Sequence, residues 1–129
     1  MSLPQALAAV AAGGAIGAVL RWGISLTLAR AMARGAWAGF PAGTLLVNVV
    51  GTFALAYLIS SGLTRGAGGQ WVRLFVGTGL LGALTTFSTF GLDTHGLVSQ
   101  GRVGQSVAYL GGTLILAGLA VLAGWAAGR

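Results

Sequence analysis

The chain has 129 residues, of which 56% are hydrophobic and 6% are charged, whereas a soluble domain carries roughly a quarter of charged residues. This composition excludes a water-soluble globular protein and indicates an integral membrane protein. The formal net charge is +6, but the arginines are scattered and stand mostly at the ends of apolar segments, which suits lipid headgroups and not nucleic acid. With no cysteine, one carboxylate and one histidine, the chain lacks the paired acids, metal-ligand clusters and thiols of most enzyme sites, so we expect no enzyme.

The apolar segments predict an all-α membrane protein with one domain that covers residues 1–129. Its four transmembrane helices are expected at about residues 4–31, 41–63, 70–100 and 103–127. The N-terminus lacks the basic region of a signal peptide, so the first apolar run is expected to remain as the first span.

The first span carries small and polar residues at four-residue intervals, and these therefore share one face of a helix. Gly13 and Gly17 form a small-xxx-small pair that allows another helix to approach closely. Arg21 follows on the same face, well inside the span. It is a candidate for a polar vestibule, because intramembrane arginines are commonly functional. The alternative is a structural cation that binds carbonyls or snorkels toward the headgroups, and both remain open.

The second span carries a polar stripe at intervals of four residues, formed by Thr44, Asn48 and Thr52. Asn48 is the most informative of the three, because an amide in hydrocarbon needs hydrogen-bond partners and must face protein or water. It belongs either to a functional site or to a contact between helices.

The third segment contains the run Thr85–Phe90 (TTFSTF), which places four hydroxyls and two aromatic rings at membrane depth. The helical stretches on either side, Gln70–Ala83 and Thr86–Gln100, would each reach about 20–23 Å, against a hydrocarbon core of about 30 Å. One straight helix would overshoot it. The pattern therefore favours two half-helices with a break near Gly82–Thr86, where free carbonyls and helix ends mark ion or substrate sites. The alternative is a bent helix whose hydroxyls bond to the preceding turn.

Few titratable groups follow the break. Asp93 and His95 lie toward the far end of the second half-helix, and we expect His95 to be interfacial. The fourth span presents Tyr109 and Thr113 on one face, with Ala117 as the next residue of that stripe.

The arginines at the segment ends are balanced across the membrane. Three lie on one side and three on the other: Arg30, Arg34 and Arg102 against Arg65, Arg73 and Arg129. The positive-inside rule therefore gives no orientation, and a four-span protein without this bias can insert both ways. Two opposed copies could then pair as an antiparallel dimer.

Three motifs together resemble the Fluc fluoride channels, also called the CrcB family. They are GGAIGAVLRW at 13–22, PAGTLLVNVVGTF at 41–53 and GLLGALTTFSTFGLDT at 79–94, and the resemblance covers all four spans in order. It implies a dual-topology antiparallel homodimer in the bacterial inner membrane, with two pores that export fluoride passively. It also implies a central Na⁺ held by the main-chain carbonyls of Gly82 and Thr85.

The resemblance further implies an anion pore lined by Phe87 and Phe90, Asn48, Thr44, Ser88, Thr89, Asp93, Arg21, Tyr109 and Thr113. Asp93 stands where the family commonly has Glu. Ala117 stands where the hydroxyl track of the family's fourth helix can continue with another hydroxyl.

The chemistry of these residues suits fluoride. This ion is small and strongly hydrated, so a pore must replace water with hydroxyl, amide and ring-edge contacts. Two alternatives remain open. A small dual-topology multidrug transporter would need an acid near the middle of its first helix, where this chain has none. A structural or assembly subunit would account for the glycines but not for the TTFSTF run.

Overall fold

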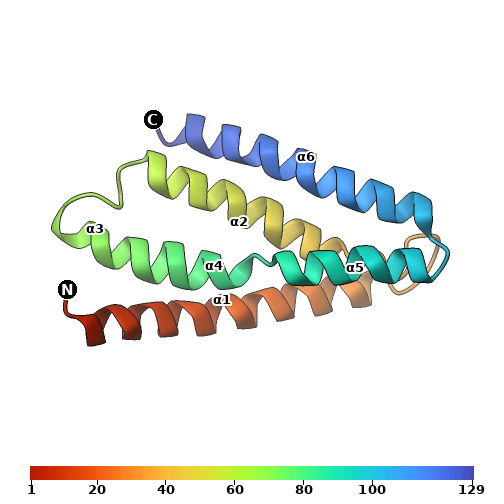
Figure 1. The fold of residues 1–129 in the computed structure, drawn as a ribbon, viewed down its shortest axis with the longest axis horizontal. Coiled ribbons are helices and arrows are strands. Elements are labelled where there is room, and N and C mark those ends of the chain that lie inside the picture. The colour runs from red at the N-terminus through yellow and green to blue at the C-terminus, as the bar shows by residue number, and fades with distance from the viewer.

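A computed structural model describes residues 1–129, which fold entirely into helices and connecting loops. The helices are α1 (Leu3–Ala31), α2 (Ala42–Ser60), α3 (Gly66–Val72), the π-helical segment η1 (Arg73–Leu81), α4 (Gly82–Leu84), α5 (Phe87–Ser99) and α6 (Val103–Ala127). Helix α1, helix α2, the stretch from α3 to α5, and helix α6 are each long and apolar enough to cross a membrane (Figure 1). The prediction of an all-α membrane protein with four spans is confirmed.

Two helix ends differ from the predicted ones. Helix α2 ends at Ser60 and not near residue 63, because Gly62 adopts a left-handed backbone with φ of +77°, which stops the helix. The third segment begins at Gly66, although residues 64–70 were expected to form a loop. There a Cβ atom on Gly69 would collide with the backbone of Thr64, five residues earlier, so glycine allows the helix to start close to the preceding turn.

The backbone leaves helical geometry at two residues of the third segment, Thr85 and Thr86. Thr85 has φ of −82° and ψ of 153°, and Thr86 has φ of −153° and ψ of 125°, so both are extended. Gly82, expected within the break, is helical, as are the next two residues. Thr86 caps α5, since its Oγ1 accepts a hydrogen bond of 3.2 Å from the amide of Thr89. Figure 1 shows the resulting gap between the coils of α4 and α5.

Glycines bring α1 and η1 into backbone contact. A Cβ atom on Gly13 would collide with the carbonyl oxygen of Phe75, and one on Gly17 would collide with that of Leu80. The predicted close approach at this small-xxx-small pair is therefore confirmed. The contact fixes η1, whose wide π-helical turns are rare in proteins and frequent at functional sites.

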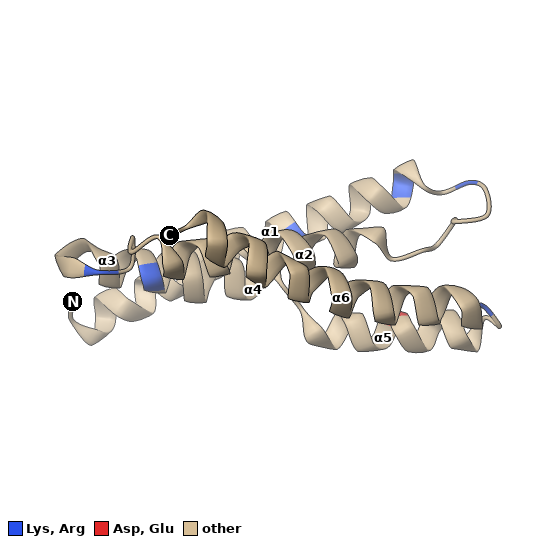
Figure 2. Ribbon diagram, turned by 90° about the horizontal axis from the view of Figure 1, so that it is seen from above, with Lys and Arg blue, Asp and Glu red and all other residues tan.

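Basic residues gather toward the two ends of the long axis, with one more basic position in the middle of α1 (Figure 2). Most large apolar side chains of the four spans are exposed in the isolated chain, as expected for surfaces that face lipid or another subunit. The core is small and has two clusters, one around Val47 and Leu84 and one formed by Phe90, Leu97 and Tyr109. In the third segment, the two extended residues Thr85 and Thr86, called the extended pair below, stand between Leu84 of the first cluster and Phe90 of the second.

Candidate functional site

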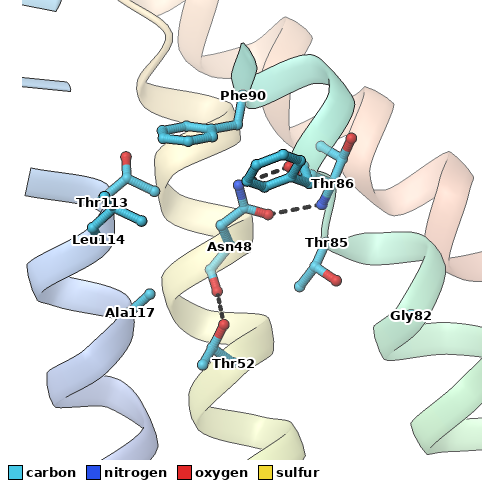
Figure 3. A pocket seen from close by; sticks show the side chains of 10 residues that line it. Asn48, Thr52, Gly82, Thr85, Thr86, Phe90, Thr113, Leu114 and Ala117 are labelled. Atoms are coloured by element: carbon cyan, nitrogen blue, oxygen red, sulfur yellow. Dashed lines mark hydrogen bonds between the residues drawn. The ribbon is translucent and has the colours of Figure 1, made fainter. Parts of the chain in front are cut away.

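Asn48 of α2 binds the extended backbone at Thr86 through two reciprocal hydrogen bonds. The Asn48 side-chain amide donates to the Thr86 carbonyl at 3.1 Å, and the Thr86 amide donates to Asn48 Oδ1 at 2.8 Å (Figure 3). One side chain thus satisfies both main-chain groups of a residue that has no helical partners, which avoids the cost of leaving them unpaired. The second hydrogen of the Asn48 amide is not used in this pair.

The next turn of α2 receives the other extended residue. The methyl group of Thr85 lies 2.5 Å from where a Cβ atom on Gly51 would stand, so only glycine leaves room for it. Asn48 and Gly51 are three apart and share one face of α2. Together they hold the extended residues Thr85 and Thr86 against α2, and we call Asn48 and Gly51 the α2 seat.

The same hydrogen bonds leave two carbonyls without their usual helical donors. The Thr86 amide, which would serve the carbonyl of Gly82 in a continuous helix, is bonded to Asn48. The Thr89 amide, which would serve the carbonyl of Thr85, is bonded to the Thr86 hydroxyl. Main-chain oxygens of this kind are available to a ligand.

A cavity of about 400 Å³ opens beside the extended pair (Figure 3). Its lining comes from α2, the third segment and α6: Asn48, Thr52, Gly82, Thr85, Thr86, Phe87, Phe90, Thr113, Leu114 and Ala117. Thr113 is 4% exposed and its hydroxyl has no hydrogen-bond partner. Because nearly all buried hydroxyls in proteins are paired, this one is free to bind something in the cavity.

The two phenylalanines of the cavity differ in exposure. Phe90 is 5% exposed and packs on Tyr109 with ring centroids 5.3 Å apart, whereas Phe87 is 82% exposed. Their own rings lie 5.8 Å apart, as expected for residues on one helix face. Tyr109 is fully buried and donates from its hydroxyl to Asp93 Oδ2 at 3.2 Å. This pair lies beyond Phe90 and does not line the cavity.

A second cavity, of about 260 Å³, lies next to Arg21. Its polar lining consists of Arg21, Ser25, Thr44, Thr86 and Thr89. The Arg21 Nε–H donates to the carbonyl of Ala83 at 3.1 Å, so this cation both binds the backbone next to the extended pair and lines a polar cavity.

Three predicted pore residues line neither of these two cavities: Ser88, Asp93 and Tyr109. Ser88 is exposed, and its hydroxyl lies 3.3 Å from that of Thr86. Thr86 was not among the predicted pore residues, yet it lines both cavities and pairs with Asn48. A threonine at the start of a helix is a signal for an N-cap and could have indicated this position.

Polar cavities inside an apolar bundle of four spans define a multi-pass membrane protein built around an intramembrane polar site. Residues 8–125 match the model of a family described as "CrcB-like protein, Camphor Resistance (CrcB)". The chain belongs to the CrcB family, which confirms the resemblance drawn from its motifs.

Relatives named "Fluoride-specific ion channel FluC" match nearly the whole chain. The protein from Paracoccus denitrificans is 40% identical over 93% of this chain and 91% of its own length. The one from Agrobacterium fabrum is 42% identical over 95% of each. A relative from Halobacterium salinarum, named "Fluoride-specific ion channel FluC 1", is 45% identical over 90% of this chain and 87% of its own.

Proposed function

We propose that this chain is a fluoride channel of a bacterial inner membrane that lets cytoplasmic fluoride leave passively. The names of the relatives point to fluoride as the ion. The composition of the 400 Å³ cavity is the observation that carries the proposal. Its wall combines a buried, unpartnered hydroxyl at Thr113, a half-used amide at Asn48 and the rings of Phe87 and Phe90.

Each of these groups can place a partially positive atom against fluoride without bringing a full positive charge. The Thr113 hydroxyl and the second Asn48 amide hydrogen are donors, and the edges of the Phe87 and Phe90 rings carry the positive end of the aromatic quadrupole. No arginine lines this cavity. An anion can therefore lose water, be held by many weak contacts and still leave quickly, as conduction requires.

We propose further that two antiparallel copies form the working unit with two pores. One wall of the cavity is open in the single chain, because Phe87 is 82% and Leu114 59% exposed while both line it. A second copy would close that wall. The balanced arginines at the two membrane faces favour opposed copies.

A Na⁺ ion bound by the main-chain oxygens of Gly82 and Thr85 would complete this assembly. These two carbonyls lack their helical donors because the Thr86 and Thr89 amides bind elsewhere. Carbonyl oxygens at interrupted helices are suitable ligands for alkali ions. In an antiparallel pair both copies would contribute the same atoms, so the ion would lie on the two-fold axis.

The cellular role is tested in a bacterial strain that lacks its own fluoride exporter. Expression of this chain should restore growth on fluoride, and the Phe90→Ile variant at equal abundance should not. Fluoride sensitivity that is unchanged by the wild-type chain would argue against the proposed function.

A further inference from the structure

Arg102 differs from the other arginines at the ends of the spans because its side chain is half-buried. Of all the arginines, Arg21 and Arg102 are half-buried, and the rest are exposed. Arg21 binds the backbone beside the extended pair, whereas Arg102 lies in the turn between α5 and α6, at one end of the bundle. The hydrogen-bond partners of Arg102 are neutral side-chain amides, so its charge is not paired with a carboxylate.

Two glutamines hold the guanidinium of Arg102 in place. Its Nη1 donates to Oε1 of Gln100 at 3.4 Å, and its Nη2 donates to Oε1 of Gln105. Gln105 donates in turn to the carbonyl of Ala36 at 3.0 Å, which ties this cluster to the loop between α1 and α2. A guanidinium carries five N–H donors, so these two bonds leave donors free for an anion.

A small polar cavity of about 130 Å³ adjoins this guanidinium. Its lining includes Gly39, Asp93 and Gln100, the last of which binds Arg102. A Cβ atom on Gly39 would stand 3.1 Å from Nη1 of Arg102, so the cation lies against the wall of the cavity. The cavity therefore has a carboxylate in its lining and a guanidinium at its edge.

A series of side-chain contacts joins this small cavity to the 400 Å³ cavity. Asp93 accepts a hydrogen bond of 3.2 Å from Tyr109, and the Tyr109 ring packs on Phe90, which lines the larger cavity. An anion that followed these side chains toward the end of the bundle would approach the Asp93 carboxylate and be repelled by it. The guanidinium of Arg102 stands where it can offset that repulsion.

We propose that Arg102 is the positive group at the mouth of the fluoride path at this end of the bundle, where its charge attracts the anion into the small cavity and offsets the repulsion from Asp93. This proposal rests on the proposed function. The attraction needs no direct contact, because charges interact over a Debye length of about 8 Å at physiological salt. A fixed positive charge at a narrow mouth raises the local concentration of anions and so the rate at which they enter.

Fluoride efflux from liposomes at low and high ionic strength, normalised to the amount of folded protein, tests this role. Arg102→Gln should lower the rate by about threefold or more at low ionic strength, because the mouth loses its charge. With about 1 M potassium gluconate on both sides of the membrane, where the Debye length is about 3 Å, its rate should come within about twofold of wild type. Arg102→Lys, which keeps the charge, should stay within about twofold of wild type in both conditions.

Arg34→Gln is the matched control, since it removes the same charge from an exposed side chain in the loop that Gln105 binds. Its rate should stay within about twofold of wild type. Three results would each overturn the proposal while leaving the fluoride channel intact: a wild-type rate in Arg102→Gln, an equal loss in Arg34→Gln, or a loss that salt does not reduce and lysine does not restore. A wild-type chain that releases no fluoride would remove both.

Discussion

At the residue scale, the polar groups of the site divide into those that hold the fold and those that are left for an ion. Thr86 and the carbonyl of Ala83 are held by Asn48 and Arg21, so these two side chains have structural partners as well as a place in the cavities. Thr113 has no partner at all. A substitution at Thr113 should therefore affect fluoride transport without lowering the stability of the fold.

Thr113→Val should lower fluoride flux while keeping or raising stability. Replacing an unpartnered buried hydroxyl by a methyl group removes a desolvation cost of about 1 kcal/mol from the folded state but also removes a donor from the cavity. Ser106→Ala is the matched control on the same helix, because the Ser106 hydroxyl donates to the carbonyl of Thr94 at 3.0 Å. It should lose about 1 kcal/mol of stability and keep its flux. The opposite pattern, stability lost at Thr113 and flux lost at Ser106, would contradict the assignment.

Phe87→Ile and Phe90→Ile should each reduce fluoride flux by about tenfold or more in protein that elutes normally, because isoleucine keeps the apolarity and most of the volume but has no electropositive ring edge. Efflux from liposomes measures this directly. If these residues only pack, both variants will conduct within about twofold of wild type.

At the element scale, the third segment depends on the α2 seat, because two extended residues inside a span need partners that a helix cannot give them. Asn48 supplies the hydrogen bonds and Gly51 supplies the room for the Thr85 methyl group.

Gly51→Ala should therefore destabilise the folded protein by about 1–3 kcal/mol, the usual cost of overpacking a close contact. The double variant Gly51→Ala/Thr85→Ser, which removes the methyl group that collides, should recover most of the loss. Unfolding of the purified protein in detergent provides the measurement. A double variant no more stable than Gly51→Ala alone would show that the Thr85 methyl group is not what collides with the new side chain at position 51.

The four spans were predictable because apolar length is a local signal, and the clustered hydroxyls drew attention to the part of the third segment that borders the 400 Å³ cavity. Six of the predicted site residues line the 400 Å³ cavity: Asn48, Gly82, Thr85, Phe87, Phe90 and Thr113. The helical state of Gly66–Gln70 was not predictable, because its glycines have a low helix propensity. The π-helical turns of η1 were not predictable either, because η1 packs on the distant backbone of α1. Whether Arg21 serves the fold or a cavity was also open, since a sequence does not show that Ala83 lies beside it.

At the scale of the whole molecule, an incomplete cavity wall and balanced charge favour an antiparallel homodimer. Single cysteines introduced at Ser2 and at Ala33, which lies between α1 and α2, should each react with a membrane-impermeant reagent from both sides of the membrane, at about half of the copies from either side. The chain has no native cysteine, so each label reports one position. Reaction from one side only would rule out dual topology.

The most direct test of fluoride conduction is ion efflux from liposomes that contain the purified wild-type chain. Vesicles loaded with equal fluoride and chloride should release fluoride rapidly once a potassium ionophore dissipates the membrane potential, while they retain chloride as protein-free vesicles do. Fluoride release no faster than from protein-free vesicles, or chloride release at the same rate as fluoride, would contradict a fluoride-selective pore.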